Sequence, residues 1–175
     1  MTIRDFEDKQ PKIHASTFVD ETALVLGDVK IGENCSIWPF TVIRGDVNTI
    51  QIGNNTNIQD NSVLHVTHDG PYNPGGYDLK VGNTVTVGHR VILHGCHIGN
   101  SCLIGMGATI MDGAVVESHT LIGAGSLVTP NKHLESGYLW IGSPIRKVRK
   151  LSDEELESIE YSAANYVKLK NKHQL

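Results

Sequence analysis

The chain has 175 residues, a formal net charge of −4 at pH 7, and charged residues of both signs. This length predicts one domain with a substantial core, and the absence of a basic stripe argues against nucleic-acid binding. No apolar run approaches the roughly 18 residues of a membrane span, and the polar N-terminus does not resemble a signal peptide. We therefore expect a cytoplasmic protein without a membrane partner.

An aliphatic residue, here called an anchor, recurs every six positions after an N-terminal extension of residues 1–12. The anchors are Ile13, Val19, Val25, Ile31, Ile37, Ile43, Ile52, Ile58, Leu64, Val81, Val87, Leu93, Ile98, Ile104, Ile110, Val116, Ile122 and Val128. A small or β-branched residue usually follows four positions later. A period of six is typical of a parallel β-helix, in which each hexapeptide forms one short strand and one corner.

Three hexapeptides make one triangular coil of 18 residues, so residues 13 to about 133 predict six coils within a β-helical region spanning 13–145. Glycines and prolines in the segment 67–80 indicate a loop that protrudes from the column. We expect residues 146–175 to form a C-terminal helical region. There, Ser152 and Glu155 make a capping box, which predicts a helix over about 153–171 with an apolar face against the β-helix or a neighbour.

The three cysteines do not form an even set. Cys35 and Cys102 occupy small corner positions, so we expect packed thiols. Cys96 lies two residues after His94, which leaves both a core role and a metal-ligand role open.

The anchors predict where three histidines point. Ile43, Leu64 and Leu93 fall on the same wall of successive coils, and Arg44, His65 and His94 follow them directly. These three polar side chains should form an outward column with a spacing of about 4.8 Å. Two imidazoles at that spacing can converge on one cation, with metal–nitrogen distances of roughly 2.0–2.1 Å.

His89 follows Val87 by two residues on the adjoining wall, in the place that Asp60 takes after Ile58. Its side chain should leave in another direction and miss the His65–His94 pair of its own chain. A cyclic homotrimer would bring it to the pair of the next subunit and give three identical sites. Three histidines with an open fourth position are the catalytic zinc pattern, although three unrelated surface histidines are the plainer alternative.

Polar residues gather near these histidines. Arg44 and Asp46 lie one coil before His65, and Asn57, Gln59 and Asp60 lie near the position of His89. A plain polar corner could explain the second group. The Arg–Asp pair could also act across a subunit boundary, as support for the metal ligands and as a lock for the trimer.

Long segments of the chain resemble the gamma-class carbonic anhydrase family, and in particular its small bacterial branch. The segments are IWPFTVIRGDV, QIGNNTNIQDNSVLHVTH, VTVGHRVILHGCHIGNSCLIGMGATIMDGA and ESGYLWIGSPIRKVRKLSDEE. The resemblance implies a left-handed parallel β-helix, a homotrimer and zinc sites at the subunit boundaries.

The family's functional residues can be carried over by position. The metal ligands then fall on His65, His89 and His94, and the bridging Arg–Asp pair on Arg44 and Asp46. The polar residues near the metal water fall on Asn57, Gln59 and Asp60. A Tyr-Ser-x-x-Asn motif of the C-terminal helix places Asn165 as a further candidate.

The resemblance implies that a zinc-bound hydroxide attacks CO₂ to give bicarbonate, with Gln59 orienting the hydroxide. Two positions depart from the family prototype: Val47 replaces one glutamate, and His68 stands near the place of a proton-shuttling glutamate. His68 could carry protons or could anchor the loop, and efficient hydration does not follow from the match. Iron or cobalt would also suit imidazole ligands.

Other functions stay open on the sequence. A hexapeptide acyltransferase would use a histidine as base without a metal. A thioester hydrolase could use the same metal. A trimeric scaffold would hold a metal only to join its subunits, and four protein ligands would favour that reading over three ligands plus water.

Overall fold

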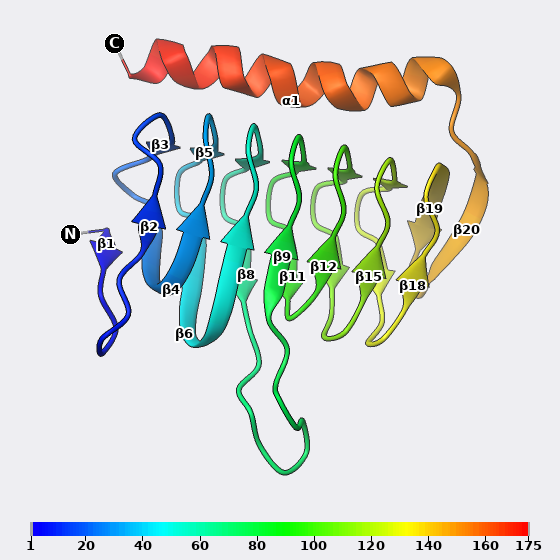
Figure 1. Ribbon diagram of the computed structural model, residues 1–175. Helices are drawn as coiled ribbons and strands as arrows, with labels where there is room; N and C mark the ends of the chain where they lie inside the picture. Colours follow the sequence, from blue (N-terminus) through cyan, green and yellow to red (C-terminus); the bar gives the residue numbers. More distant parts are fainter. Residues whose placement is uncertain (1, 175) are drawn as a thin grey trace.

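The computed structural model describes residues 2–174. The chain winds into a column of stacked coils, one long helix runs along the whole column, and one loop projects from the opposite side (Figure 1). No helix among these residues has the length and apolar character needed to cross a membrane.

The strands are short, except where one strand passes round a corner. They are β1 (Ile3–Arg4), β2 (Lys12–Ile13), β3 (Phe18–Val19), β4 (Leu24–Ile31), β5 (Ser36–Ile37), β6 (Val42–Ile52), β7 (Asn57–Ile58), β8 (Val63–His65), β9 (Leu79–Val81), β10 (Thr86–Val87), β11 (Ile92–His94), β12 (His97–Ile98), β13 (Leu103–Ile104), β14 (Thr109–Ile110), β15 (Val115–Val116), β16 (Leu121–Ile122), β17 (Leu127–Val128), β18 (His133–Leu134), β19 (Tyr138–Gly142) and β20 (Ile145–Lys150). The helix is α1 (Asp153–His173).

Three parallel walls make the column. The first wall stacks β3, β5, β7, β10, β13, β16 and β19. The second wall stacks the N-terminal parts of β4 and β6 with β8, β11, β14 and β17. The third wall stacks β2, the C-terminal parts of β4 and β6, β9, β12, β15 and β18. This architecture confirms the expected parallel β-helix.

Partners on successive coils confirm the expected coil length: Leu103 pairs with Leu121 and Leu121 with Leu139, each 18 residues further along. Beyond the six expected coils, β19 adds a further parallel rung to the first wall, which lies within the expected β-helical region of residues 13–145.

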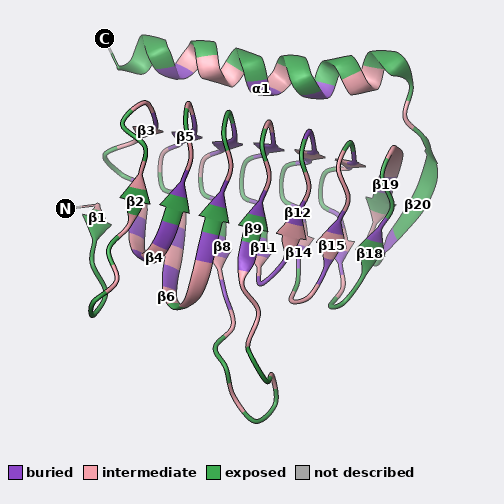
Figure 2. Ribbon diagram, viewed as in Figure 1, coloured by how far each residue is buried: buried purple, intermediate pink, exposed green. Residues whose placement is uncertain are grey.

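The anchors fill the column, and buried residues recur along its strands in Figure 2. Ile37, Ile43, Ile58, Leu64 and Leu93 are all completely buried. The small residues of the corners are also buried, and the residue before each often has a positive φ, as at Asn34 and Asn55. Asparagine adopts this left-handed conformation more readily than most side chains do, which explains its place in the corners.

The three thiols belong to this core. Cys35, Cys96 and Cys102 have no exposed surface, and burial raises the pKa of the Cys35 and Cys102 thiols to about 11. Burial also raises the pKa of the Cys96 thiol strongly. The Cys96 side chain is completely buried among the core residues of the column, so the structure favours its core role.

Helix α1 begins and ends close to the expected bounds. Ser152 accepts a hydrogen bond from the Glu155 backbone, and the Glu155 side chain accepts one from the Ser152 backbone, which confirms the capping box. Ile159 and Ala163 are buried, and the helix contacts β5, β7 and β10 of the first wall. The apolar face therefore packs on the column of its own chain.

Three expected boundaries need correction. Residues 146–150 are not part of the helical region, because the chain reverses after β19 and β20 pairs with it in antiparallel fashion. The column does not begin at residue 13, because Ile3 of β1 and Lys12 of β2 already pair with β4. The loop ends before residue 79, because Leu79 is buried and pairs with Ile50.

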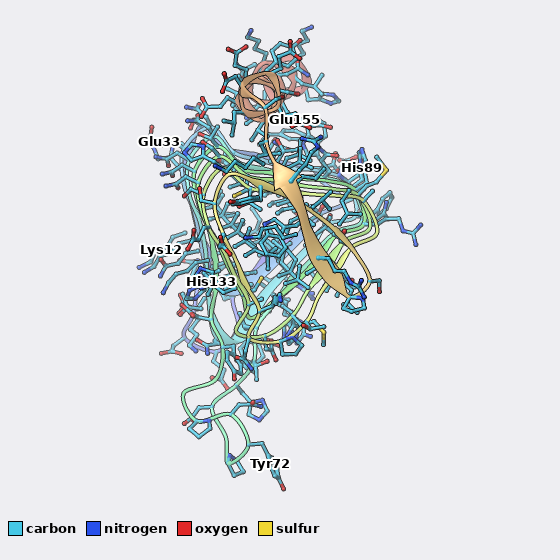
Figure 3. All side chains as sticks on the ribbon, turned by 90° about the vertical axis from the view of Figure 1, so that its right-hand side faces the viewer. Lys12, Glu33, Tyr72, His89, His133 and Glu155 are labelled. Carbon is cyan, nitrogen blue, oxygen red and sulfur yellow. The ribbon has the colours of Figure 1, made fainter. Side chains whose placement is uncertain are left out.

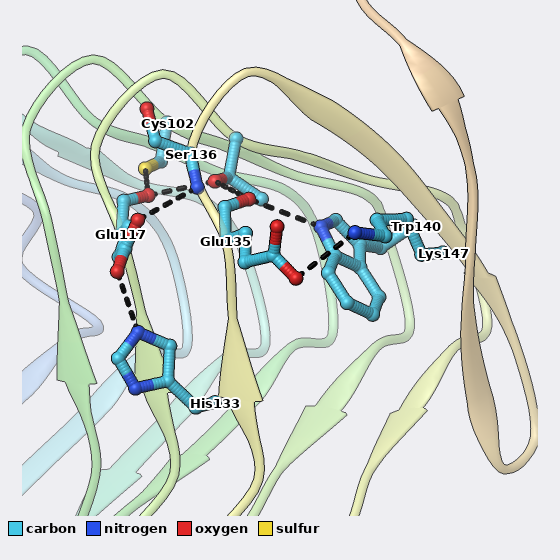
Figure 4. A network of polar contacts seen from close by, with 8 residues as sticks. Cys102, Glu117, His133, Glu135, Ser136, Trp140 and Lys147 are labelled. Carbon is cyan, nitrogen blue, oxygen red and sulfur yellow. Dashed lines mark hydrogen bonds and ion pairs between the residues drawn. The ribbon is translucent and has the colours of Figure 1, made fainter.

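The C-terminal end of the column is closed by polar contacts (Figure 4). Glu117 accepts hydrogen bonds from His133 at 2.6 Å and from the backbone of Ser136 at 2.9 Å. Lys147 on β20 donates to Glu135 at 2.9 Å. The last coil is thereby tied to the hairpin of β19 and β20, which covers the end of the hydrophobic column.

Candidate metal centre

His65 and His94 lie side by side on the second wall. β8 and β11 pair in register, so that His65 lies opposite His94 while the anchors Leu64 and Leu93 stack beneath them. The two rings are 5.0 Å apart at their centroids, and His65 Nδ1 lies 3.0 Å from His94 Nε2. The expected outward column is therefore present, with the two imidazoles facing each other across one rung.

A carboxylate holds the outer nitrogen of each ring. His65 Nε2 lies 3.2 Å from Asp46 Oδ1, and Arg44 donates to the other oxygen of Asp46 at 2.6 Å. His94 Nδ1 lies 2.6 Å from Asp112 Oδ1. Arg44 and Asp46 pair within one chain. Asp46 also contacts His65 and so orients its ring.

Asp112 is a site residue that the sequence reasoning missed. It lies two positions after the anchor Ile110, one coil beyond His94. An acidic residue one coil beyond a candidate ligand is the same signal that singled out Asp46 one coil before His65. The sequence therefore places an acidic residue one coil before His65 and another one coil after His94.

The electrostatics around His65 favour a neutral imidazole. Burial lowers the pKa of His65, and the charges of Arg44 and His94 lower it further, against the opposing effect of Asp46. Burial acts to raise the pKa of Asp46, but hydrogen bonds from Arg44 and His65 outweigh it and lower that pKa. A neutral imidazole next to an ionised carboxylate is the state in which histidine binds a metal.

The geometry of the pair suits a shared cation. If Asp46 and Asp112 each accept an N–H, the two nitrogens that face each other both carry lone pairs. Two nitrogens bound tetrahedrally to one zinc ion at roughly 2.0–2.1 Å lie about 3.3 Å apart. The observed separation of 3.0 Å is close to this value. The donor chemistry of His65 and His94 therefore fits zinc.

His89 lies apart from this pair within one chain. It sits at the corner between the first and second walls, where its Nδ1 is 2.9 Å from Asp60 Oδ2. His65 and His94 end strands at the other edge of the second wall, so the width of that wall separates them from His89. Figure 3 shows His89 on the outside of the column, away from the projecting loop with Tyr72. Among residues 2–174 of one chain, no group of three or more His, Cys, Asp or Glu side chains is arranged to hold a metal ion. The three-histidine set remains a prediction.

Gln59 and Asn57 form a buried polar row on the first wall. Gln59 donates to Asn57 at 3.1 Å, and Asn57 donates to Thr86 at 2.9 Å. Thr86 in turn contacts Ser162 of helix α1 at 3.3 Å. The buried side chains of this row thus find hydrogen-bond partners beneath the helix. Gln59 contacts neither His65 nor His94 within one chain.

The remaining candidates are exposed. His68 lies at the base of the loop, three residues after His65, and Val47 is also exposed. Asn165 lies exposed on helix α1, over the first wall rather than beside the His65–His94 pair. Their roles at a metal stay predictions.

Comparison with known proteins places the chain in a family. The bacterial transferase hexapeptide family (six repeats) matches residues 10–45 and 95–130. Protein YrdA of Escherichia coli is 54% identical over 98% of this chain and 93% of its own length. The chain belongs to the hexapeptide-repeat family of YrdA.

Members of this family carry more than one functional name. A protein named carbonic anhydrase from Geobacillus kaustophilus is 44% identical over 94% of this chain and 87% of its own. The crystal structure of a hexapeptide transferase family protein from Anaplasma phagocytophilum is 40% identical, with a TM-score of 0.90 over 98% of this chain and 97% of its own. The family resemblance to carbonic anhydrases is thus shown by close relatives.

Proposed function

We propose that this chain is a gamma-class carbonic anhydrase that hydrates CO₂ to bicarbonate at zinc sites shared between the subunits of a homotrimer. The pairing of His65 Nδ1 and His94 Nε2 at 3.0 Å, with a carboxylate behind each ring, is the observation that carries this proposal. The relative named carbonic anhydrase supports the choice of reaction.

The third ligand is His89 of a neighbouring subunit. Within one chain its ring lies on the far edge of the second wall, and Asp60 holds its Nδ1 at 2.9 Å and leaves Nε2 as the outward nitrogen. A threefold arrangement that places this edge against the next column would complete three identical sites. Exposed apolar side chains on and beside the second wall, Val63, Ile92 and Met111, support a contact there.

Zinc held by three imidazoles lowers the pKa of water to about 7 and so supplies a nucleophile for CO₂ at neutral pH. His65 and His94 would hold the ion, and the contacts of Asp46 with His65 and of Asp112 with His94 would leave the facing ring nitrogens without protons. His68 stands exposed three residues from His65, where an imidazole can pass the released proton to buffer. Gln59 follows β7 on the first wall, so it would approach the ion from the neighbouring subunit, as His89 does, and would have to exchange its bond to Asn57.

CO₂ hydration by zinc-loaded protein, followed by stopped flow, tests the proposal. We expect His89→Ala to lose at least 100-fold in kcat/KM, because the ion would lose a third of its protein ligands. His97→Ala is the matched control, since His97 also contacts an aspartate, Asp78 at 2.7 Å, but lies on the third wall. Activity of the His89→Ala protein equal to that of the control would contradict the proposal.

An acyltransferase is the second candidate, and the name of the hexapeptide transferase family protein favours it. Acetyl transfer from coenzyme A to amine or hydroxyl acceptors would then proceed in metal-free protein. A thioester hydrolase would instead release coenzyme A without an acceptor and would need the ion. A protein that binds one zinc per chain and shows neither acetyl transfer nor thioester hydrolysis would favour the anhydrase. Zinc with four protein ligands and no activity would indicate a scaffold.

A further inference from the structure

We infer that Asp112 is the positioning residue that sets His94 as a metal ligand, and that Thr67 at the base of the projecting loop fixes Asp112. This inference rests on the proposed function, because it concerns the same ion. Asp112 uses both oxygens: Oδ1 lies 2.6 Å from His94 Nδ1, and Oδ2 accepts from Thr67 Oγ1 at 2.8 Å.

These contacts decide which nitrogen of His94 is free. An ionised carboxylate only accepts hydrogen bonds, so the proton of a neutral His94 ring must lie on Nδ1. Nε2 then carries a lone pair, and this is the atom that faces His65 at 3.0 Å. His65 presents Nδ1 instead, because Asp46 holds its Nε2 at 3.2 Å. The two aspartates therefore select opposite nitrogens on the two rings.

The charge of Asp112 is directed at His94 alone. Among residues 2–174, no lysine or arginine forms an ion pair with Asp112, and its ionic contact is the one to His94. Asp78 on the third wall differs, since it meets His97 at 2.7 Å and also Lys80 at 2.9 Å. The Asp112 carboxylate is therefore committed to His94 and to the Thr67 hydroxyl.

Close packing fixes Asp112 to the loop base. Gly95 has a φ of +51°, and a Cβ atom there would collide with Asp112 Oδ1 and would lie 2.6 Å from Tyr77 Cβ. Tyr77 forms two backbone hydrogen bonds of 3.0 Å with Thr67, which closes the loop of residues 68–76. The loop base, Asp112 and His94 thus form one connected unit, so the loop is coupled to the position of a ligand.

Zinc affinity measured by competition with a chromogenic chelator tests this inference. We expect Asp112→Ala to bind Zn²⁺ about 10–100-fold more weakly than wild type, as loss of such carboxylate partners does elsewhere. Asp112→Asn should fall between the two, because an amide oxygen still accepts from Nδ1 but carries no charge. Asp78→Ala is the matched control and should bind zinc within about threefold of wild type.

The loop contact has its own pair of variants. Thr67→Val removes the hydroxyl at nearly constant volume and should weaken zinc binding by several-fold, while Thr67→Ser restores wild-type affinity. These variants, together with Asp112→Asn, keep the test decisive if Asp112→Ala does not fold. Nitrogen-15 spectra of the metal-free proteins give a readout that does not depend on zinc: His94 should be the Nδ1–H tautomer in wild type and lose this preference in Asp112→Ala.

The outcomes separate the two proposals. A wild-type protein that binds zinc while Asp112→Ala and Asp112→Asn bind it equally well would overturn the role of Asp112 alone. Wild-type affinity in Thr67→Val would overturn the coupling to the loop. A wild-type protein that binds no stoichiometric zinc would overturn the proposed function, and the positioning role with it.

Discussion

Leu93 offers a direct test of the stacked column beneath the metal centre. Its side chain is completely buried, and it lies in register with Leu64 on one side and Ile110 on the other. Replacement of a buried leucine by alanine costs about 2–5 kcal/mol of unfolding free energy, and the cost is highest where the surroundings cannot collapse.

The rungs around Leu93 cannot collapse easily. Backbone hydrogen bonds of 2.9 Å hold Val63 to Val91 on one side and Ile92 to Ala108 on the other. We therefore expect Leu93→Ala to lose about 3–5 kcal/mol, which corresponds to a decrease in Tm of roughly 6–20 °C for a domain of this size.

Urea unfolding of metal-free protein measures this loss without the contribution of a ligand, and one fixed protein concentration keeps the contribution of assembly constant. Leu93→Met keeps the volume and should cost less than about 1.5 kcal/mol. Val148→Ala, at a side chain that is 56% exposed, should stay within about 0.5 kcal/mol. A loss below about 1.5 kcal/mol for Leu93→Ala would refute the view that the stacked anchors hold the column together.

Three further predictions concern the ion, an aspartate and a glycine. Chelation should lower Tm and shift sedimentation from the proposed trimer to smaller species, because the proposed third ligand, His89, would come from a neighbour; an unchanged trimer with unchanged Tm would contradict the shared site. The pKa of Asp46 is lower in the folded state, so its contribution is present above the ordinary carboxyl pKa of about 4 and is lost as pH falls through the folded value. The difference in unfolding free energy between wild type and Asp46→Asn should therefore shrink in acid, and a constant difference would count against the shift. Gly82→Ala places a Cβ 2.8 Å from the backbone of Gly99 and should cost about 1–3 kcal/mol by calorimetry, whereas Gly70→Ala on the loop should cost under about 0.5 kcal/mol.

The period of six predicted most of the fold. It assigned Leu64 and Leu93 to one wall, and this assignment alone placed His65 opposite His94 before any coordinates were considered. It could not reveal β20, because Ile145–Lys150 pairs with β19 in antiparallel fashion and follows no repeat. The series of anchors also ended early, because Leu134 of β18 and Trp140 of β19 are buried and continue the period of six after Val128.

The geometry of the site was harder to predict from the sequence, because the orientation of the histidine rings depends on contacts between coils. The spacing placed His65 and His94 together but did not say which nitrogens face each other. That choice depends on Asp46 and Asp112, which lie on different coils and approach from opposite sides. The satisfied row from Gln59 to Thr86 was hidden for a similar reason, since it requires knowledge of where helix α1 lies.

The course of helix α1 has a consequence for how the molecule comes apart. The helix leaves the last coil, meets Ser101 through Glu160 at 2.9 Å, and ends with His173 packed 5.8 Å from Phe18 and 5.1 Å from Trp38 of the first coils. A stack of repeats that touch only their neighbours can fray from either end. Here helix α1 packs along the coils from the last to the first, so the loss of one coil also removes contacts between the helix and the others. Unfolding should therefore proceed in a single cooperative step.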